Sequence, residues 1–245
     1  MSAFDGVRRV VFAHAHPDDE TLATGALIQH LTRSGVAVAV VTATRGELGA
    51  VVPGPLSALE GTPELEPHRV GELTAALRAL GAQGPYFLGD PPARAIGLAP
   101  RRYTDSGMVW LDAAETLAGP GPDAGPDALS RAEPAEIAHD IATFATACEA
   151  EALVSYDDHG GYGHPDHIAL HTPTVEAARL LGIPFWEVAS DPEGPGEHVD
   201  ATAYLDQVKA ALAHHATQVT VDGDEVVHVG GQRQPIATRF TLRRA

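Results

Sequence analysis

The chain has 245 residues, a length that favours one large α/β domain over two small ones. Its 16 Lys and Arg residues against 33 Asp and Glu residues give a formal net charge of −17, and a field of that sign repels nucleic-acid phosphates and anionic membrane surfaces. We therefore expect neither a nucleic-acid partner nor a membrane partner.

The single cysteine, Cys148, cannot form an internal disulfide, which favours a reducing compartment. The first 20 residues contain no apolar run of signal-peptide length, and no apolar stretch approaches the roughly 18 residues that a membrane span needs. We expect a cytoplasmic protein, and the sequence leaves its oligomeric state open.

The first 44 residues predict a βαβ unit. Residues 10–13 form a short apolar segment with β-branched residues, which predicts a buried strand. Apolar residues then recur at helical spacing over 21–34, and Gly35 suits the position that ends a helix. Residues 36–44 are apolar on both faces, as strands of a parallel sheet usually are.

The same alternation continues along the chain, with a loop over 118–128 and further helices and strands on both sides of it. The predicted helices cover 69–80, 134–150, 174–181 and 209–216, and the predicted strands cover 86–88, 153–156 and 185–189. Residues 219–229 predict a hairpin that turns at Gly223. We expect a single domain over 1–245 of the α/β class, a Rossmann-like three-layer α/β/α fold with a mostly parallel sheet and a C-terminal β-hairpin.

The loop after the first strand lacks the glycine fingerprint of dinucleotide-binding proteins and the Walker A lysine. It carries His16, Asp18, Asp19 and Glu20 instead. Because neighbouring side chains of an extended segment point to opposite sides, one of the two aspartates can bind a metal while the other faces a substrate. A coincidental loop in a nucleotide-binding protein is a weaker alternative.

A second cluster, HGGYGHPDH over 159–167, follows the predicted strand 153–156. The carboxyl ends of parallel strands meet at one edge of a sheet, so we expect the two clusters to lie together. One imidazole and one carboxylate from the first cluster and one imidazole from the second would leave a fourth position open, as in catalytic zinc sites. Isolated histidines are more often surface or core residues, and we assign no site role to His14, His139, His198 and His228.

The paired motifs HPDDE (16–20) and GHPDH (163–167) resemble the PIG-L/LmbE-like family of zinc-dependent N-acetylglucosamine deacetylases. Segments 70–81, 105–108, 159–167 and 215–218 look like the mycothiol-biosynthesis branch, whose enzyme deacetylates N-acetylglucosaminyl-inositol. The resemblance implies one zinc ion per chain, with iron as its rival, held by His16, Asp19 and His167. It also implies that Asp18 is the general base.

The resemblance further implies that His164 stabilises an oxyanion or acts as an acid, with Asp166 orienting its ring. We expect the acidic surroundings and Asp166 to raise the pKa of His164. Tyr162 would help to polarise the amide carbonyl. Arg69 and Asp105 would hold sugar hydroxyls, although Arg69 could equally be a solvated residue at a helix start.

The substrate stays open because the stretch between 174 and 209 is shorter than the mycothiol deacetylase leads us to expect. Segment 190–200 should therefore leave one side of the pocket wider and more acidic. Alternatives are a mycothiol-conjugate amidase, a deacetylase of a specialised-metabolite amino sugar, and a metal- or sugar-binding domain without activity. The amidases tend to have YPHPDH and a lysine soon after HPDDE, whereas this chain has Tyr162-Gly-His164 and Thr24-Gly25.

Overall fold

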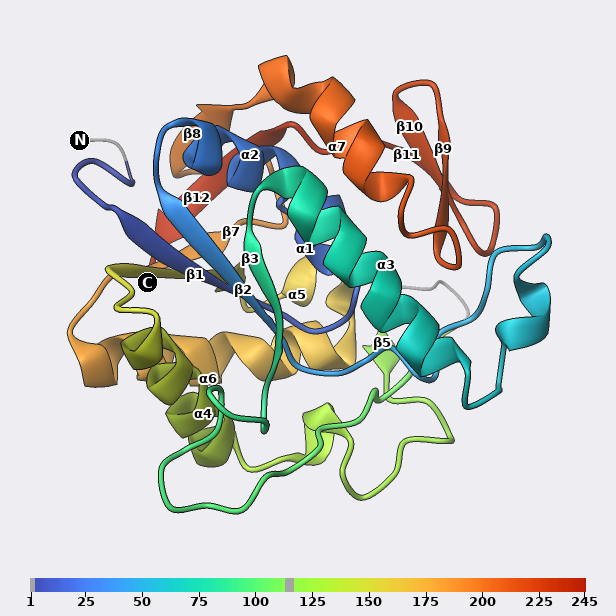
Figure 1. Cartoon of the computed structure of the whole chain (residues 1–245), viewed down its shortest axis with the longest axis horizontal. Helices are drawn as coiled ribbons and strands as arrows, with labels where there is room; N and C mark the ends of the chain where they lie inside the picture. The colour runs from blue at the N-terminus through green and yellow to red at the C-terminus, as the bar shows by residue number, and fades with distance from the viewer. Residues whose placement is uncertain (1–2, 113–116) are drawn as a thin grey trace.

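The computed structural model describes residues 3–112 and 117–245 and is built on a seven-stranded sheet (Figure 1). The strand order is β3-β2-β1-β6-β7-β12-β8, in which the first five strands run parallel and β12 is antiparallel to both of its neighbours. In that order the strands are Gln83–Phe87, Ala37–Thr42, Arg9–His14, Ala152–Tyr156, Phe185–Val188, Arg239–Arg244 and Glu197–Asp200. The predicted mostly parallel sheet is confirmed.

Helices cover both faces of this sheet, as predicted for a three-layer fold (Figure 1). One face packs against α2 (Gly25–Arg33), α3 (Leu65–Leu80) and α7 (Leu205–Leu212), and the other against α4 (Pro134–Ala147) and α6 (Pro165–Leu181). The shorter helices are α1 (Asp19–Leu22), α5 (Gly160–Gly163), η1 (Ser57–Leu59), η2 (Leu129–Arg131) and η3 (Thr202–Tyr204).

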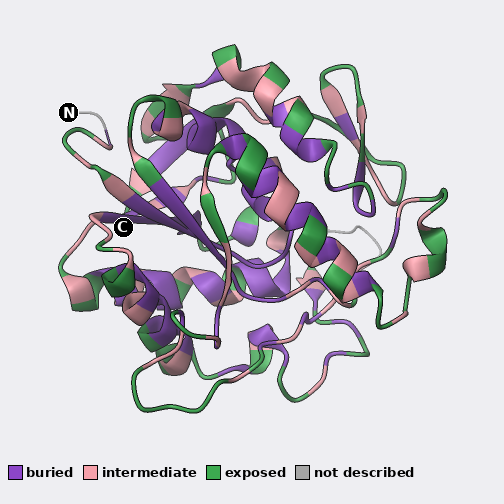
Figure 2. Ribbon diagram, in the orientation of Figure 1, coloured by how far each residue is buried: buried purple, intermediate pink, exposed green. Residues whose placement is uncertain are grey.

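Strand β1 shows how the sequence pattern produces the two apolar layers. Val10 and Phe12 belong to the cluster under α2, α3 and α7, while Val11 and Ala13 belong to the cluster under α4 and α6. Alternate side chains of a strand point to opposite faces, so an all-apolar strand is buried on both sides. The central strands are accordingly buried along most of their length (Figure 2).

Two predicted helices differ from the observed ones in ways that affect the site. The helix predicted over 21–34 is two helices, α1 and α2, and the Oγ1 of Thr24 between them donates to the Glu20 carbonyl at 2.9 Å. The helix predicted to start at 174 begins at Pro165 and runs through Pro173. Pro173, a residue type that normally ends a helix, lies directly before the predicted start.

The C-terminal hairpin is confirmed, and a third strand pairs with it. Strands β9 (Val219–Asp222) and β10 (Glu225–His228) turn at Gly223, whose φ is +65°, and β11 (Arg233–Pro235) adds a third strand. Sequence analysis assigned neither β12, which returns to the main sheet, nor β8. A small ribbon of β4 (Val109–Trp110) and β5 (Ala118–Gly119) begins the predicted loop 118–128. No helix in the described part of the chain is long and apolar enough to cross a membrane.

Candidate active site

The two sequence clusters lie at neighbouring strand ends. Strand β1 pairs in parallel with β6, and their last residues are His14 and Tyr156. The loops that follow, 15–18 and 157–159, therefore leave the sheet at the same edge, and the helices after them carry the rest of each motif. The expected meeting of the two clusters is observed.

The first motif is a tight turn with an unusual backbone. The His16 N–H donates to Asp19 Oδ2 at 2.9 Å, which folds the turn back on itself. Asp18 has φ +124°, and it is one of two non-glycine residues with positive φ among residues 3–112 and 117–245. Such a conformation typically costs about 1–3 kcal/mol and is concentrated at functional sites. As a result Asp19 is buried while Asp18, its neighbour, is partly exposed.

The second motif forms the start of α6. Pro165 occupies the first helical position, where its missing N–H is not needed, and His164 is the N-cap. The His164 Nδ1 accepts a hydrogen bond from the Asp166 backbone N–H at 3.1 Å. A neutral His164 therefore carries its proton on Nε2 and can donate it to a substrate.

Three donor atoms converge between the motifs. Asp19 Oδ2 lies 3.2 Å from His16 Nδ1 and 3.2 Å from His167 Nε2. Two atoms bound to one tetrahedral zinc at about 2.0–2.1 Å lie roughly 3.3 Å apart, so this spacing fits a metal. His167 Nδ1 faces the Gly160 carbonyl at 3.1 Å, and its buried Nε2 has no hydrogen-bond partner in the described structure. An orphaned buried lone pair is what a metal ligand requires.

Asp166 contacts His164 through its backbone N–H, as described above, whereas its carboxylate contacts His16. Its Oδ2 lies 3.1 Å from His16 Nε2 and also accepts the Ser106 backbone N–H at 2.9 Å. The carboxylate thus directs the other nitrogen of His16, Nδ1, toward Asp19. A carboxylate behind a metal-binding imidazole is a common way to fix the ring and increase its basicity. Asp105 Oδ1 lies 3.6 Å from the same His16 Nε2.

Other ligand sets are also close together. One ring nitrogen each of His16, His164 and His167 lies within 4.8 Å of the others, as do the ligand atoms of His16, Asp105 and Asp166. The Asp166 carboxylate oxygens already have hydrogen-bond partners in His16 and Ser106. The set of His16, Asp105 and Asp166 therefore fits a metal less well.

Burial and neighbouring charges shift the pKa values of Asp18 and Asp19 in opposite directions. Burial, reinforced by the charge of Asp19, raises the pKa of Asp18 to about 8. Burial alone would raise the pKa of Asp19 as well, but His167 and His16 hold it well below its usual range. Two adjacent carboxyl groups thus differ strongly in proton affinity, and a cation bound at Asp19 would lower the pKa of Asp18.

The expected rise in the pKa of His164 is wrong. Burial, together with His16 and His167, lowers this pKa to about 3, because desolvation and two imidazoles outweigh the nearby Asp166. His164 is therefore a neutral hydrogen-bond donor near pH 7, not an imidazolium.

Tyr162 lies over the cluster on a glycine-rich turn. Gly161 and Gly163 on either side of it have φ +69° and +89°, which only glycine adopts readily. The Tyr162 ring meets the His167 ring edge-to-face at 5.2 Å between centroids. The residue is 59% exposed, yet burial around its hydroxyl and the charge of Asp19 raise its pKa well above the usual value. The ring thus packs against the histidines of the second motif while much of the side chain stays exposed.

Arg69 is not a solvated residue at a helix start. It lies in the second turn of α3, is 3% exposed, and donates from Nη1 to the Gly46 carbonyl at 2.6 Å and from Nη2 to the Ala50 carbonyl at 2.9 Å. A Cβ on Gly49 would stand 2.1 Å from Arg69 Nη1, so a larger residue there would displace the guanidinium. Arg69 therefore holds the loop after β2, with Nε left without a partner in the described residues.

Sequence analysis missed Tyr156 and gave His14 no role. The Tyr156 hydroxyl donates to Asp19 Oδ2 at 2.8 Å and accepts the Ala15 N–H at 2.9 Å, and its ring stacks on His167 at 4.1 Å. His14 Nδ1 lies 3.3 Å from the same hydroxyl. The available signal was position, because Tyr156 ends the predicted strand 153–156 and His14 directly follows the predicted strand 10–13.

Removing the Tyr156 hydroxyl should weaken the metal site. Tyr156→Phe leaves Asp19 without one donor and Ala15 without an acceptor, so we expect the free energy of unfolding to fall by about 1–3 kcal/mol. We expect metal affinity to fall about 10- to 100-fold, by competition with a chelator. Tyr103→Phe is the matched control, since its buried hydroxyl donates to Asp140 at 2.8 Å and contacts no site residue. Equal metal affinity in both variants would contradict this role for Tyr156.

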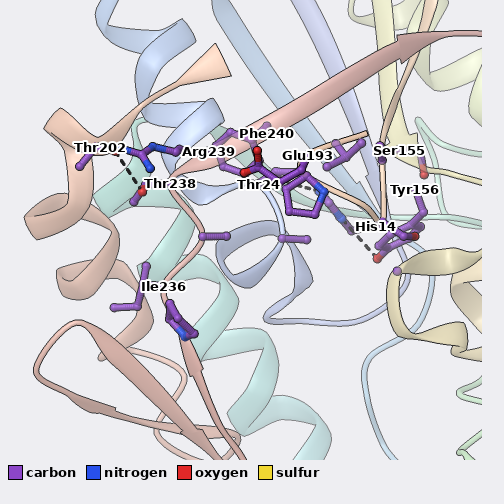
Figure 3. Close-up of a pocket in the computed structure, with 18 residues that line it drawn as sticks. His14, Thr24, Ser155, Tyr156, Glu193, Thr202, Ile236, Thr238, Arg239 and Phe240 are labelled. Atoms are coloured by element: carbon purple, nitrogen blue, oxygen red, sulfur yellow. Dashed lines mark hydrogen bonds between the residues drawn. The ribbon is translucent and has the colours of Figure 1, made fainter. Parts of the chain in front are cut away.

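A cavity of about 620 Å³ lies beside the site at the same edge of the sheet (Figure 3). His14 and Tyr156 stand at one end of it, and segment 189–193 and residues 235–240 form other walls. Of segment 190–200, Ser190, Pro192 and Glu193 line this cavity, whose lining is mainly apolar and hydroxyl side chains with Glu193 and Arg239 among them.

Comparison with known proteins agrees with this geometry. The family profile described as PIG-L, GlcNAc-PI de-N-acetylase, matches residues 11–178, which include both motifs. The chain belongs to the PIG-L family. A curated PIG-L relative from Kineococcus radiotolerans, 1D-myo-inositol 2-acetamido-2-deoxy-alpha-D-glucopyranoside deacetylase, is 37% identical over 93% of this chain and 73% of its own length. A relative of the same name from Kribbella flavida is 33% identical over 88% of this chain and 84% of its own length.

The fold is shared with solved structures named as deacetylases. The N,N'-diacetylchitobiose deacetylase from Pyrococcus horikoshii superimposes with a TM-score of 0.60 at 20% identity, covering 87% of this chain and 72% of that one. An identity this low supports the architecture, while family membership rests on the sequence match.

Proposed function

We propose that this chain hydrolyses the acetamide of an N-acetylglucosaminyl conjugate, working as a single deacetylase domain over 1–245. The observation that carries the proposal is the buried Asp19, whose Oδ2 lies 3.2 Å from a ring nitrogen of both His16 and His167, beside the strained Asp18. That arrangement combines a metal site, with an unpartnered imidazole nitrogen, and a separate carboxylate. Family membership supports the same reaction.

His16, Asp19 and His167 would hold one divalent ion, which we propose to be zinc because two imidazoles and one carboxylate suit a borderline-soft cation. When bound, the ion supplies Lewis-acid polarisation and a more acidic water. Protein purified without added metal should contain about one equivalent of zinc by elemental analysis. One equivalent of iron would contradict zinc but keep the site. Absence of metal even after reconstitution would contradict the proposed metal site.

Asp18 is the proposed general base, because its carboxylate is partly exposed while that of Asp19 is buried among metal-binding side chains. The Nε2–H of neutral His164 and the hydroxyl of Tyr162 would donate hydrogen bonds to the oxyanion of the tetrahedral intermediate. Because His164 Nδ1 accepts the Asp166 N–H, the ring carries one proton, on Nε2, and we do not assign it the role of proton donor to the leaving amine. Asp18 then returns the proton that it accepted from water to the departing amine.

Arg69 and Asp105 are the proposed contacts to the sugar hydroxyls. Asp105 is buried 3.6 Å from His16, and the charges of Asp18 and Asp105 both act on the pKa of Arg69, so the three groups are close together. The second hydrogens of the Arg69 terminal nitrogens stay available beside the bonds to Gly46 and Ala50.

The proposed substrate is N-acetylglucosaminyl-inositol or a close analogue, supported by the names of the relatives. Free-amine release should show the highest kcat/KM on this conjugate, above free N-acetylglucosamine, diacetylchitobiose and a mycothiol conjugate. Preference for the mycothiol conjugate would instead indicate an amidase. Equal and poor rates on all four would indicate a specialised-metabolite amino sugar, which the adjoining cavity of about 620 Å³ has room to admit. We propose the cytoplasm as its location, supported by the unpaired Cys148.

A further inference from the structure

Glu20 and His215 form a buried pair that the proposed reaction does not use. Both residues are 0% exposed, and His215 Nε2 lies 2.9 Å from Glu20 Oε1. Glu20 belongs to α1, directly after the two aspartates, whereas His215 follows α7 and is 195 positions away in sequence. A buried charged pair usually contributes little net stability, because desolvation offsets the attraction.

The second oxygen of Glu20 contacts the strained residue itself. Glu20 Oε2 accepts the Asp18 backbone N–H at 3.0 Å. On the other side of Asp18, its carbonyl accepts the N–H of Thr21 at 2.9 Å and that of Leu22 at 2.8 Å. Both peptide groups of Asp18 are thus fastened to α1. Without such contacts a non-glycine residue at φ +124° would relax toward negative φ.

His215 is itself held in place by its own segment. Its N–H donates to the Leu212 carbonyl at 2.9 Å, and Gln218 Nε2 lies 3.3 Å from its Nδ1. Two residues on, Thr217 donates from its N–H and its Oγ1 to Glu72 of α3, at 2.8 Å and 2.6 Å. These hydrogen bonds hold the connection between α7 and β9 in place, with His215 beside Glu20.

We propose that Glu20 and His215 are positioning residues that hold Asp18 in its left-handed conformation and so direct its carboxylate into the site. His215 fixes the Glu20 carboxylate, and Glu20 fixes the Asp18 peptide. The proposal rests on the proposed function, in which Asp18 is the base. It makes the C-terminal part of the chain, outside the matched residues 11–178, a contributor to catalysis.

The test compares substitutions of Glu20 in the full-length, metal-loaded protein. Glu20→Met keeps the side-chain length but has no acceptor for the Asp18 N–H, so kcat should fall about 10- to 100-fold while KM and metal content stay within about twofold. His215→Ala should likewise lower kcat and leave KM and metal content within about twofold. Glu20→Gln should recover most of the kcat, because its amide oxygen can accept the Asp18 N–H while its NH₂ faces His215, which can change tautomer.

Glu72→Gln is the matched control. It weakens the anchor of the same segment at Thr217, while His215 keeps its contacts to Leu212 and Gln218, so it should lower the melting temperature and reduce kcat far less than Glu20→Met does. Loss of kcat in Glu72→Gln equal to that in Glu20→Met would assign the effect to general loosening and overturn the proposal. Unchanged kcat in a folded Glu20→Met would also overturn it.

Crystal structures of metal-free wild type and Glu20→Met give a readout that does not depend on activity. We expect Asp18 to leave its positive φ in the variant, and an unchanged Asp18 backbone would overturn the proposal. If the wild-type protein hydrolyses no acetamide, the proposed function fails, and the crystallographic comparison still decides whether Glu20 sets the Asp18 backbone.

Discussion

Asp18→Asn should keep the metal and lose most of the activity, with kcat lower by about 10²- to 10⁴-fold. An amide has nearly the same shape as the carboxylate and can remain at φ +124°, since the backbone contacts of Asp18 come from Glu20, Thr21 and Leu22. It cannot accept the proton of the attacking water. Metal content by elemental analysis and kcat on the proposed conjugate are the two measurements.

Asp158→Asn is the control for the change in charge. It removes one negative charge beside the second motif, but its side chain is 67% exposed and lies 3.9 Å from the His159 ring. We expect near-normal kcat from it. Near-normal turnover by Asp18→Asn would show that the roles of the two adjacent aspartates have been assigned wrongly.

Asp19→Ala and His167→Ala should each lose the metal itself, and with it all measurable hydrolysis. Asp19 Oδ2 is the atom shared by the two imidazole contacts at 3.2 Å, so removing it leaves His16 and His167 without a common anionic neighbour. Removing His167 takes away the buried nitrogen that has no other partner in the described residues. Metal content after dialysis should fall from about one equivalent to near zero.

The control for these variants is His159→Ala, in the same motif as His167 but with a side chain that is 77% exposed. It should retain metal and activity. If Asp19→Ala kept a full equivalent of metal, the ligand set would have to be redrawn around His16, His164 and His167, whose ring nitrogens lie within 4.8 Å of one another.

The sequence by itself determined the class of fold and the region of the site. Short β-branched strands alternating with helices predict a parallel sheet, and the strand-end rule then brings HPDDE and GHPDH to one edge. These inferences succeed because they depend on local periodicity and on a topological rule. The helix over 165–181 was only half predicted, since Pro173 inside it gives the local signal of a helix boundary.

Only the tertiary structure decided which atoms meet within the site. Asp166 binds His16, 150 residues away, and Tyr156 donates to Asp19, 137 residues away, and neither pairing leaves a local pattern. Arg69 is buried against the carbonyls of Gly46 and Ala50, which no helix-start signal could show. The pKa of His164 went opposite to the expectation from net charge, because burial among imidazoles outweighs the acidic field of the whole chain. Desolvation and long-range contacts are properties of the folded chain, and no sequence window contains them.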